Sequence, residues 1–186
     1  YDNIVQSMFT SMMNRRFTRE SQKPNAPFMS SSVGIGAVAR GYDYFGLGIL
    51  PRNGVDEEIK ALEASWKMIL QAFMYGFSED ELNTVKAHIK ANLETAYKEQ
   101  DKTSNNSYME DILVNFLENE PNMDFDVYYN FANKVLNEIT VGDIMKRIPQ
   151  MIQGSNTAII VTGLDVPHMT KEQAFAVMNN IDASSI

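Results

Sequence analysis

The sequence contains no cysteine and only two histidines, His88 and His168. Without cysteine the chain can form neither a disulfide framework nor a thiolate zinc site. It also has no apolar run near the roughly 20 residues that a bilayer-spanning helix needs, so we expect no membrane span. The absence of cysteine does not fix the compartment, and cell envelope, periplasm and cytoplasm all stay open.

Basic residues are also scarce relative to acidic ones. The sequence has 16 Lys and Arg and 24 Asp and Glu, which gives a formal net charge of −8. The Lys and Arg residues do not cluster into a basic stripe. A nucleic-acid surface needs clustered Lys and Arg, so nucleic acid is not expected as a partner. With 186 residues and 44% hydrophobic content, the chain has enough apolar material for one domain with a real core.

Neither histidine lies in a metal-binding pattern. A zinc helix needs a second ligand four residues after His88, and that position is Asn92. His168 and Glu172 have the spacing to share a metal, but two ligands do not make a zinc site. We therefore interpret both histidines as surface residues. No serine lies in a nucleophile-elbow context, so we name no catalytic, metal-binding or cofactor-binding residue, and the substrate-binding residues stay unknown.

The pattern of apolar residues predicts an α+β domain. Residues 28–39 and 42–50 alternate as half-buried strands of a β-hairpin with its turn at Arg40-Gly41, and the apolar run 156–162 predicts a central, well-covered strand. Helices are predicted at 3–21, 56–75, 79–103, 107–118, 124–137, 141–152 and 171–180. The fold class is a small antiparallel sheet covered by several helices, in a single domain spanning 1–186.

Four glycines of the hairpin could be mistaken for a phosphate cradle. Gly34, Gly36, Gly46 and Gly48 alternate inside strands, whereas a dinucleotide loop places its glycines at a strand-to-helix turn. They indicate instead that something packs closely against that face of the hairpin.

Helix ends are clearly marked around residues 75–82. Gly76 is placed to end one helix, and Ser78 and Glu81 form a capping box for the next, with Phe77 stapled against Leu82. Arg15, Arg16 and Arg19 lie near the end of the first helix. There they complement the helix dipole, with anion or carboxylate binding as the alternative.

Gly76-Phe77-Ser78-Glu79-Asp80-Glu81-Leu82, followed by a long Lys/Glu-rich helix, resembles a recurrent stretch of the pitrilysin/insulinase family of zinc metallopeptidases. The resemblance continues through further segments in the same order along almost the whole chain. These segments are 12–17, 22–28, 138–144 and the strand at 156–162.

The resemblance implies a repeated α+β domain, copies of which enclose a chamber that holds extended peptides. Zinc in that family is bound by His-x-x-Glu-His and a distal Glu, and no position here matches them. The chain is therefore similar to a non-catalytic companion domain, and its expected partners are a zinc-bearing domain of the same chain or a paired subunit, and the peptide substrate. Some companion domains supply an Arg and a Tyr near the peptide, and we do not transfer these roles to Arg40 and Tyr42.

Tyr1 is not an initiator methionine, and helical periodicity begins at once, so we expect a piece of a longer protein that lacks the first strands of its sheet. By itself it is expected to bind no stoichiometric zinc and to cleave no peptide. One alternative is a catalytically inactive scaffold or partner subunit of the same fold. A generic helical interaction domain is a third possibility, favoured only if no sheet carries the hairpin and residues 156–162.

Overall fold

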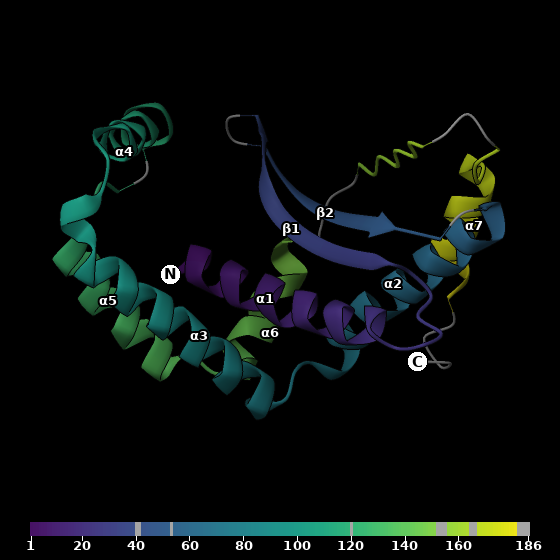
Figure 1. Ribbon diagram of the computed structural model, residues 1–186, viewed down its shortest axis with the longest axis horizontal. Coiled ribbons are helices and arrows are strands. Elements are labelled where there is room, and N and C mark those ends of the chain that lie inside the picture. Colours follow the sequence, from purple (N-terminus) through teal and green to yellow (C-terminus); the bar gives the residue numbers. More distant parts are fainter. Residues whose placement is uncertain (40–41, 53, 120, 152–155, 164–166, 182–186) are drawn as a thin grey trace.

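A computed structural model describes residues 1–39, 42–52, 54–119, 121–151, 156–163 and 167–181. Seven α-helices and one hairpin make up the regular structure of this part (Figure 1). The helices are α1 (Asp2–Ser21), α2 (Val55–Tyr75), α3 (Glu79–Lys98), α4 (Asn105–Glu118), α5 (Phe125–Glu138), α6 (Val141–Met151) and α7 (Lys171–Asn180), and a short 3-10 helix, η1, spans Gln100–Lys102. No described helix is long and apolar enough to cross a bilayer.

The sheet is a two-stranded antiparallel hairpin of β1 (Ser30–Ala39) and β2 (Tyr42–Leu50), as predicted. The predicted turn at Arg40-Gly41 lies outside the described residues. One face of the hairpin lies on α1 (Figure 1). Asn14 of α1 fixes the register between them, because its side-chain amide donates to the Val33 carbonyl at 3.1 Å and accepts from the Val33 N–H at 2.8 Å. This amide satisfies main-chain groups of β1 that the hairpin partner does not reach.

Helix α1 runs through the centre of the core. Six apolar residues of this methionine-rich face are buried, so the face belongs to the core and is not a binding groove: Val5, Met8, Phe9, Met12, Met13 and Phe17. Phe9 lies among three rings, Phe45 of β2, Phe73 of α2 and Phe77, at centroid distances of 5.8–6.3 Å. Such tilted, stacked and edge-on pairs add to the stabilisation from burial. The single core cluster draws residues from the hairpin and from α1, α2, α3, α5 and α6.

Helical periodicity predicts that α2 packs through Ile59, Leu62, Trp66, Ile69, Leu70 and Phe73, but the buried face is rotated slightly from this one. Small side chains lie at its centre, since Ala61, Ser65 and Ala72 are fully buried, while Trp66 lies at the flank and is only partly buried. Small residues at this contact let the helix backbone approach its neighbours closely. Periodicity alone favours the larger side chains as the contact face, which explains the offset.

The junction between α2 and α3 confirms the predicted end and start signals. Gly76 ends α2 with φ 73°, a conformation that favours glycine, and its N–H donates to the Ala72 carbonyl. Ser78 and Glu81 form the reciprocal capping box, and Phe77 and Leu82 are both buried in the core. Helix α3 ends at Lys98, so the prediction of one helix to 103 is wrong in its last turn, where η1 follows.

Arg16 of α1 ties this junction to the core helix. Its Nε and Nη2 donate to the two carboxylate oxygens of Glu81 at 2.7 and 2.8 Å, and Nη2 also donates to the Gly76 carbonyl at 2.9 Å. The guanidinium lies over the Phe77 ring, 4.4 Å from its centroid. The carboxylate predicted as an alternative partner for the arginines is thus Glu81 of the same chain.

The spacing of Lys86, Lys90, Glu94 and Lys98 predicts a solvated face of α3, and this prediction is wrong for the first half of the face. Lys86 donates from Nζ to the Ile139 carbonyl at 2.6 Å, and Lys90 donates to the Asn137 side chain. The carbonyls at the end of α5 lack intrahelical partners, and a lysine side chain satisfies them well. Only the part of the face beyond Lys90, with Glu94 and Lys98, is exposed.

The predicted strand at 156–162 is not formed. These residues are extended but exposed, and within the described chain no strand pairs with them. Ile160 is 84% exposed, so the expected covered, central position is also wrong. A β-rich segment becomes a strand only when a neighbour supplies the ladder hydrogen bonds, and composition cannot report that neighbour.

Helices α4 and α5 expose apolar residues that the sequence pattern assigns to a core. In α5, Val135 and Leu136 are buried as predicted, but Tyr128 and Phe131 are 39% and 38% exposed. All of the apolar stripe of α4 is exposed. The pattern predicts an amphipathic helix correctly in both cases, but it cannot say whether a partner covers the apolar face.

Glu81 gives the fold a pH dependence with a defined sign. The hydrogen bonds from Arg16 lower the pKa of Glu81 from its ordinary 4.5 to about 2, against the opposing effect of burial. A carboxylate with a depressed folded-state pKa stabilises the fold fully above its unfolded-state pKa, and this contribution is lost as the pH falls toward 2.

We therefore expect Glu81→Gln to lower the free energy of unfolding at pH 7 by about 1–3 kcal/mol. The difference between wild type and variant should shrink as the pH falls from 4.5 toward 2 in urea titrations followed by circular dichroism. Glu94→Gln is the control, because the Glu94 side chain is 60% exposed and lies 3.9 Å from Lys98. A pH-independent difference would show that the Glu81 charge does not stabilise the fold.

Candidate functional site

The hairpin face turned away from α1 carries small residues. Ser32, Gly34 and Gly48 are exposed there, and a Cβ placed at Gly34 would meet no atom within 4 Å. Tyr44 lies across its neighbours, since a Cβ at Gly46 would come within 2.9 Å of Tyr44 Cε2. The close packing that the sequence predicts for the glycines is, at this position, the ring of a tyrosine from the same strand.

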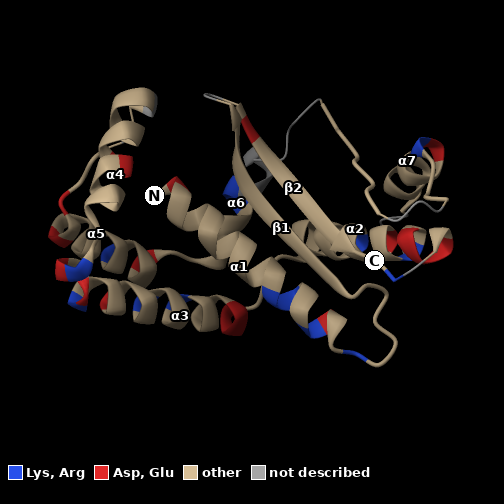
Figure 2. Cartoon of the chain, turned by 45° about the horizontal axis from the view of Figure 1, so that its top comes forward, with Lys and Arg blue, Asp and Glu red and all other residues tan. Residues whose placement is uncertain are grey.

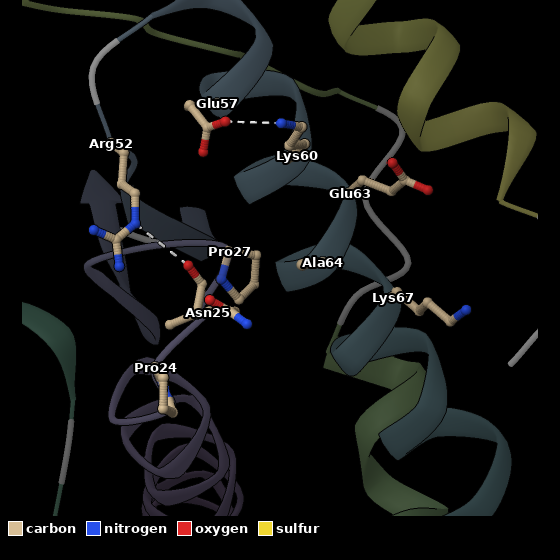
Figure 3. A pocket seen from close by; sticks show the side chains of 10 residues that line it. Pro24, Asn25, Pro27, Arg52, Glu57, Lys60, Glu63, Ala64 and Lys67 are labelled. Atoms are coloured by element: carbon tan, nitrogen blue, oxygen red, sulfur yellow. Dashed lines mark hydrogen bonds and ion pairs between the residues drawn. The ribbon is translucent and has the colours of Figure 1, made fainter.

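A cavity of about 580 Å³ lies between the loop after α1 and the exposed side of α2. Figure 3 shows that loop residues 24–27 and Arg52 lie on one side, and that Lys60, Glu63 and Lys67 project from α2 on the other. Arg52 donates from Nε to the Ala26 carbonyl at 3.4 Å, which links the end of the hairpin to the loop.

Charges of both signs line this cavity. Lys60 donates to Glu57 at 2.8 Å, and this hydrogen bond raises the pKa of Lys60, so the amine stays protonated and is no general base. The cavity combines two proline residues with mixed charges, a lining suited to polar contact and not to nucleophilic chemistry.

Glu58 and His168 form a buried contact that sequence reasoning missed. His168 Nδ1 lies 2.6 Å from Glu58 Oε1, and the Met169 N–H donates to Glu58 Oε2 at 2.7 Å. The Glu58 side chain is 9% exposed and the His168 side chain is 28% exposed, so the predicted surface histidine is partly buried and binds a buried carboxylate. The two residues are 110 positions apart in the sequence. Glu58 is one of three acidic residues in the first turn of α2, and the sequence does not distinguish it as the buried one.

The environment of Glu58 favours its charged form. Burial raises the pKa of Glu58, but the hydrogen bonds from His168 and from the Met169 N–H outweigh it, so the pKa is lowered. The contact joins the first turn of α2 to the segment that leads into α7, and α7 packs against α2. Glu58 and His168 thus position an element of the fold.

The residues that the structure describes do not fit a zinc site. Zinc in catalytic sites takes three protein ligands and a water. Among the described residues no group of three His, Asp or Glu lies close enough to hold a metal ion. His88 is exposed on α3 beside Asn92, and the carboxyl of Glu172 has its pKa lowered by its own N–H and by Thr170. We derive no chemical step through zinc for this chain.

Two residues near the hairpin turn carry no assigned role. Arg40 lies outside the described residues, and Tyr42 begins β2 with 72% of its surface exposed.

Comparison with known proteins gives one relative in sequence and several in structure. No family model matches the chain. A PqqL-like zinc protease of Arabidopsis thaliana is 22% identical over 145 residues, which are 78% of this chain and 12% of the relative.

Among solved structures, a predicted insulinase family protease from Yersinia pestis matches with a TM-score of 0.73 at 12% identity, over 97% of this chain and 38% of that one. The first half of the periplasmic protease PqqL from Escherichia coli matches with a TM-score of 0.68 at 20% identity, over 81% and 32%.

The chain has the fold of an insulinase-type protease domain. The resemblance argued from Gly76–Leu82 and the flanking segments is therefore confirmed over most of the chain. The predicted α+β class, a small antiparallel sheet covered by helices, is confirmed as well. The condition stated for a generic helical interaction domain is met in part, because the hairpin is formed but no strand of the described chain pairs with residues 156–162. The chain spans 12% of its relative in sequence, and 32% and 38% of these two solved chains.

The Glu58–His168 contact predicts a local effect that a surface histidine would not have. His168→Ala leaves the Glu58 carboxylate buried with one donor fewer, which costs about 1–3 kcal/mol. We expect amide hydrogen exchange across α7 to accelerate at least about tenfold while α3 is unchanged. His88→Ala, at the exposed histidine, is the matched control. Equal exchange in the two variants would contradict the positioning role of His168.

Proposed function

We propose that this chain is a non-catalytic domain of a zinc-dependent endopeptidase, in which it helps to form the chamber that holds extended peptide substrates. The observation that carries the proposal is an insulinase-type fold over most of a chain whose sequence has no His-x-x-Glu-His pattern. Zinc would be bound by another domain of the same longer protein or by a paired subunit.

The core supports the proposal that residues 1–186 act as one domain of that protein. One cluster of buried residues unites the hairpin with five of the helices. Arg16, Glu81 and Gly76 join the middle of the chain to its beginning, and Glu58 and His168 join α2 to the segment before α7. These long-range contacts would hold the hairpin in a fixed position beside a neighbouring domain.

The outer face of the hairpin is the proposed wall of the chamber. Beside the Tyr44 ring, Ser32, Gly34 and Gly48 leave part of this face without a bulky side chain, and glycine within a strand marks a place where another backbone can approach closely. Main-chain groups of β2 also stay without a strand neighbour in the described chain, because the sheet has two strands only. Extended peptides pair with such edges through main-chain hydrogen bonds.

The test places a bulky side chain on this face in the longer protein. Gly34→Trp meets no neighbouring atom within 4 Å of its Cβ, so the fold should be retained. We expect KM for an extended peptide to rise by about tenfold with little change in kcat, because uniform binding is lost. Glu94→Trp, at an exposed position of α3, controls for the added indole.

Two outcomes separate this function from the scaffold alternative. If Gly34→Trp leaves KM unchanged in an active protease, the hairpin face does not contact the peptide substrate. A longer protein that encodes no His-x-x-Glu-His motif and cleaves no peptide would instead favour the catalytically inactive scaffold or partner subunit.

A further inference from the structure

Helix α4 presents an uncovered apolar face. It stands at one end of the molecule, apart from the hairpin and from α1, and within the described chain it makes no extensive contact with another helix or strand (Figure 1). The face is built from side chains at spacings of three and four. They are Tyr108 at 53% exposed, Met109 at 59%, Ile112 at 57%, Leu113 at 50%, Phe116 at 81% and Leu117 at 47%.

The helix is nevertheless well defined at both ends. Ser104 accepts a hydrogen bond from the Ser107 N–H at the start, and Asn119 ends the helix in the left-handed conformation with φ 58°. An isolated helix of 14 residues is marginal in water, because helices in proteins are stabilised mainly by packing of their apolar face. Capped ends together with an unpacked apolar stripe indicate a helix that is completed by a partner.

The charge around this face restricts the partner. Residues 103–133 contain six acidic residues and no Lys, Arg or His. Glu110 and Asp111 are exposed and lie three residues from Leu113 and Tyr108 of the apolar stripe, so they form an acidic rim beside it. Figure 2 shows no blue residue on the helix. This region contributes −6 to a chain whose formal net charge is −8.

We propose that the apolar face of α4 is a docking site for a basic amphipathic helix of a partner polypeptide. Its apolar side chains would cover Met109, Ile112 and Phe116, and its Lys and Arg residues would lie against the acidic rim. Electrostatic complementarity of this kind selects among partners that share an apolar face. The inference goes beyond the proposed function, because it concerns a surface remote from the hairpin.

The same charge argues against two other occupants. A second copy would bring another strongly acidic rim against the first, and like charges at an interface are costly. An anionic lipid surface attracts helices with basic, not acidic, polar faces. Without the acidic rim, the exposed apolar face would fit a basic helix, a second copy of the chain and a lipid surface equally well.

The test uses the whole chain and two synthetic amphipathic helices with the same leucine face, one with lysine and one with glutamate on the polar face. Fluorescence anisotropy should show binding of the lysine peptide only, weakened by added salt. The variant Ile112→Ser/Phe116→Ser should weaken binding at least about tenfold, since central apolar anchors carry most of the affinity. Ile112→Leu/Phe116→Leu is the matched control and should retain binding.

A second variant keeps the test decisive if the first one unfolds. Glu110→Lys/Asp111→Lys alters only exposed side chains and should shift the preference from the lysine peptide toward the glutamate peptide. Equal binding of the two peptides, or binding that both variants leave unchanged, overturns the proposal. So does self-association of the chain abolished by Ile112→Ser/Phe116→Ser, or co-sedimentation of the chain with phosphatidylserine vesicles.

Discussion

The ion pair between Arg16 and Glu81 is the contact on which the arrangement of the first three helices depends. Glu81 accepts from the guanidinium of α1 and from the main chain of Ser78, so one carboxylate serves both the tertiary contact and the capping box of α3. Arg16 also binds the carbonyl of Gly76, the residue that ends α2. Three helices therefore meet at one hydrogen-bonded charge pair, and each depends on the geometry of the others.

Helix α2 is held in the same way at its other end. Glu58 in its first turn accepts from His168 and from the main chain before α7, while its last residue leads into the Arg16 junction. Between these two contacts, small side chains let α2 pack closely, and α1 carries the hairpin. The fold thus places the hairpin on α1 with an exposed face that includes Ser32, Gly34 and Gly48, which is the arrangement that the proposed chamber wall requires.

Features encoded by neighbouring residues could be predicted from the sequence, and features that need a distant partner could not. The end of α2 at Gly76, the capping box of Ser78 and Glu81 and the hairpin follow from local chemistry. The Arg16–Glu81 pair joins residues 65 apart, and the arginines near the end of the first helix do not indicate from sequence which carboxylate Arg16 binds. Residues 156–162 and α4 show the converse, because their apolar patterns require neighbours that the described chain does not supply.

The most direct measurement of the central claim is a double-mutant cycle on Arg16→Met and Glu81→Gln, with the free energy of unfolding measured in urea at pH 7. If the pair joins the three helices, its coupling energy is about 1–3 kcal/mol, and Arg16→Lys recovers only part of it because lysine lacks the two-pronged geometry. Additive effects of the two substitutions would contradict the account.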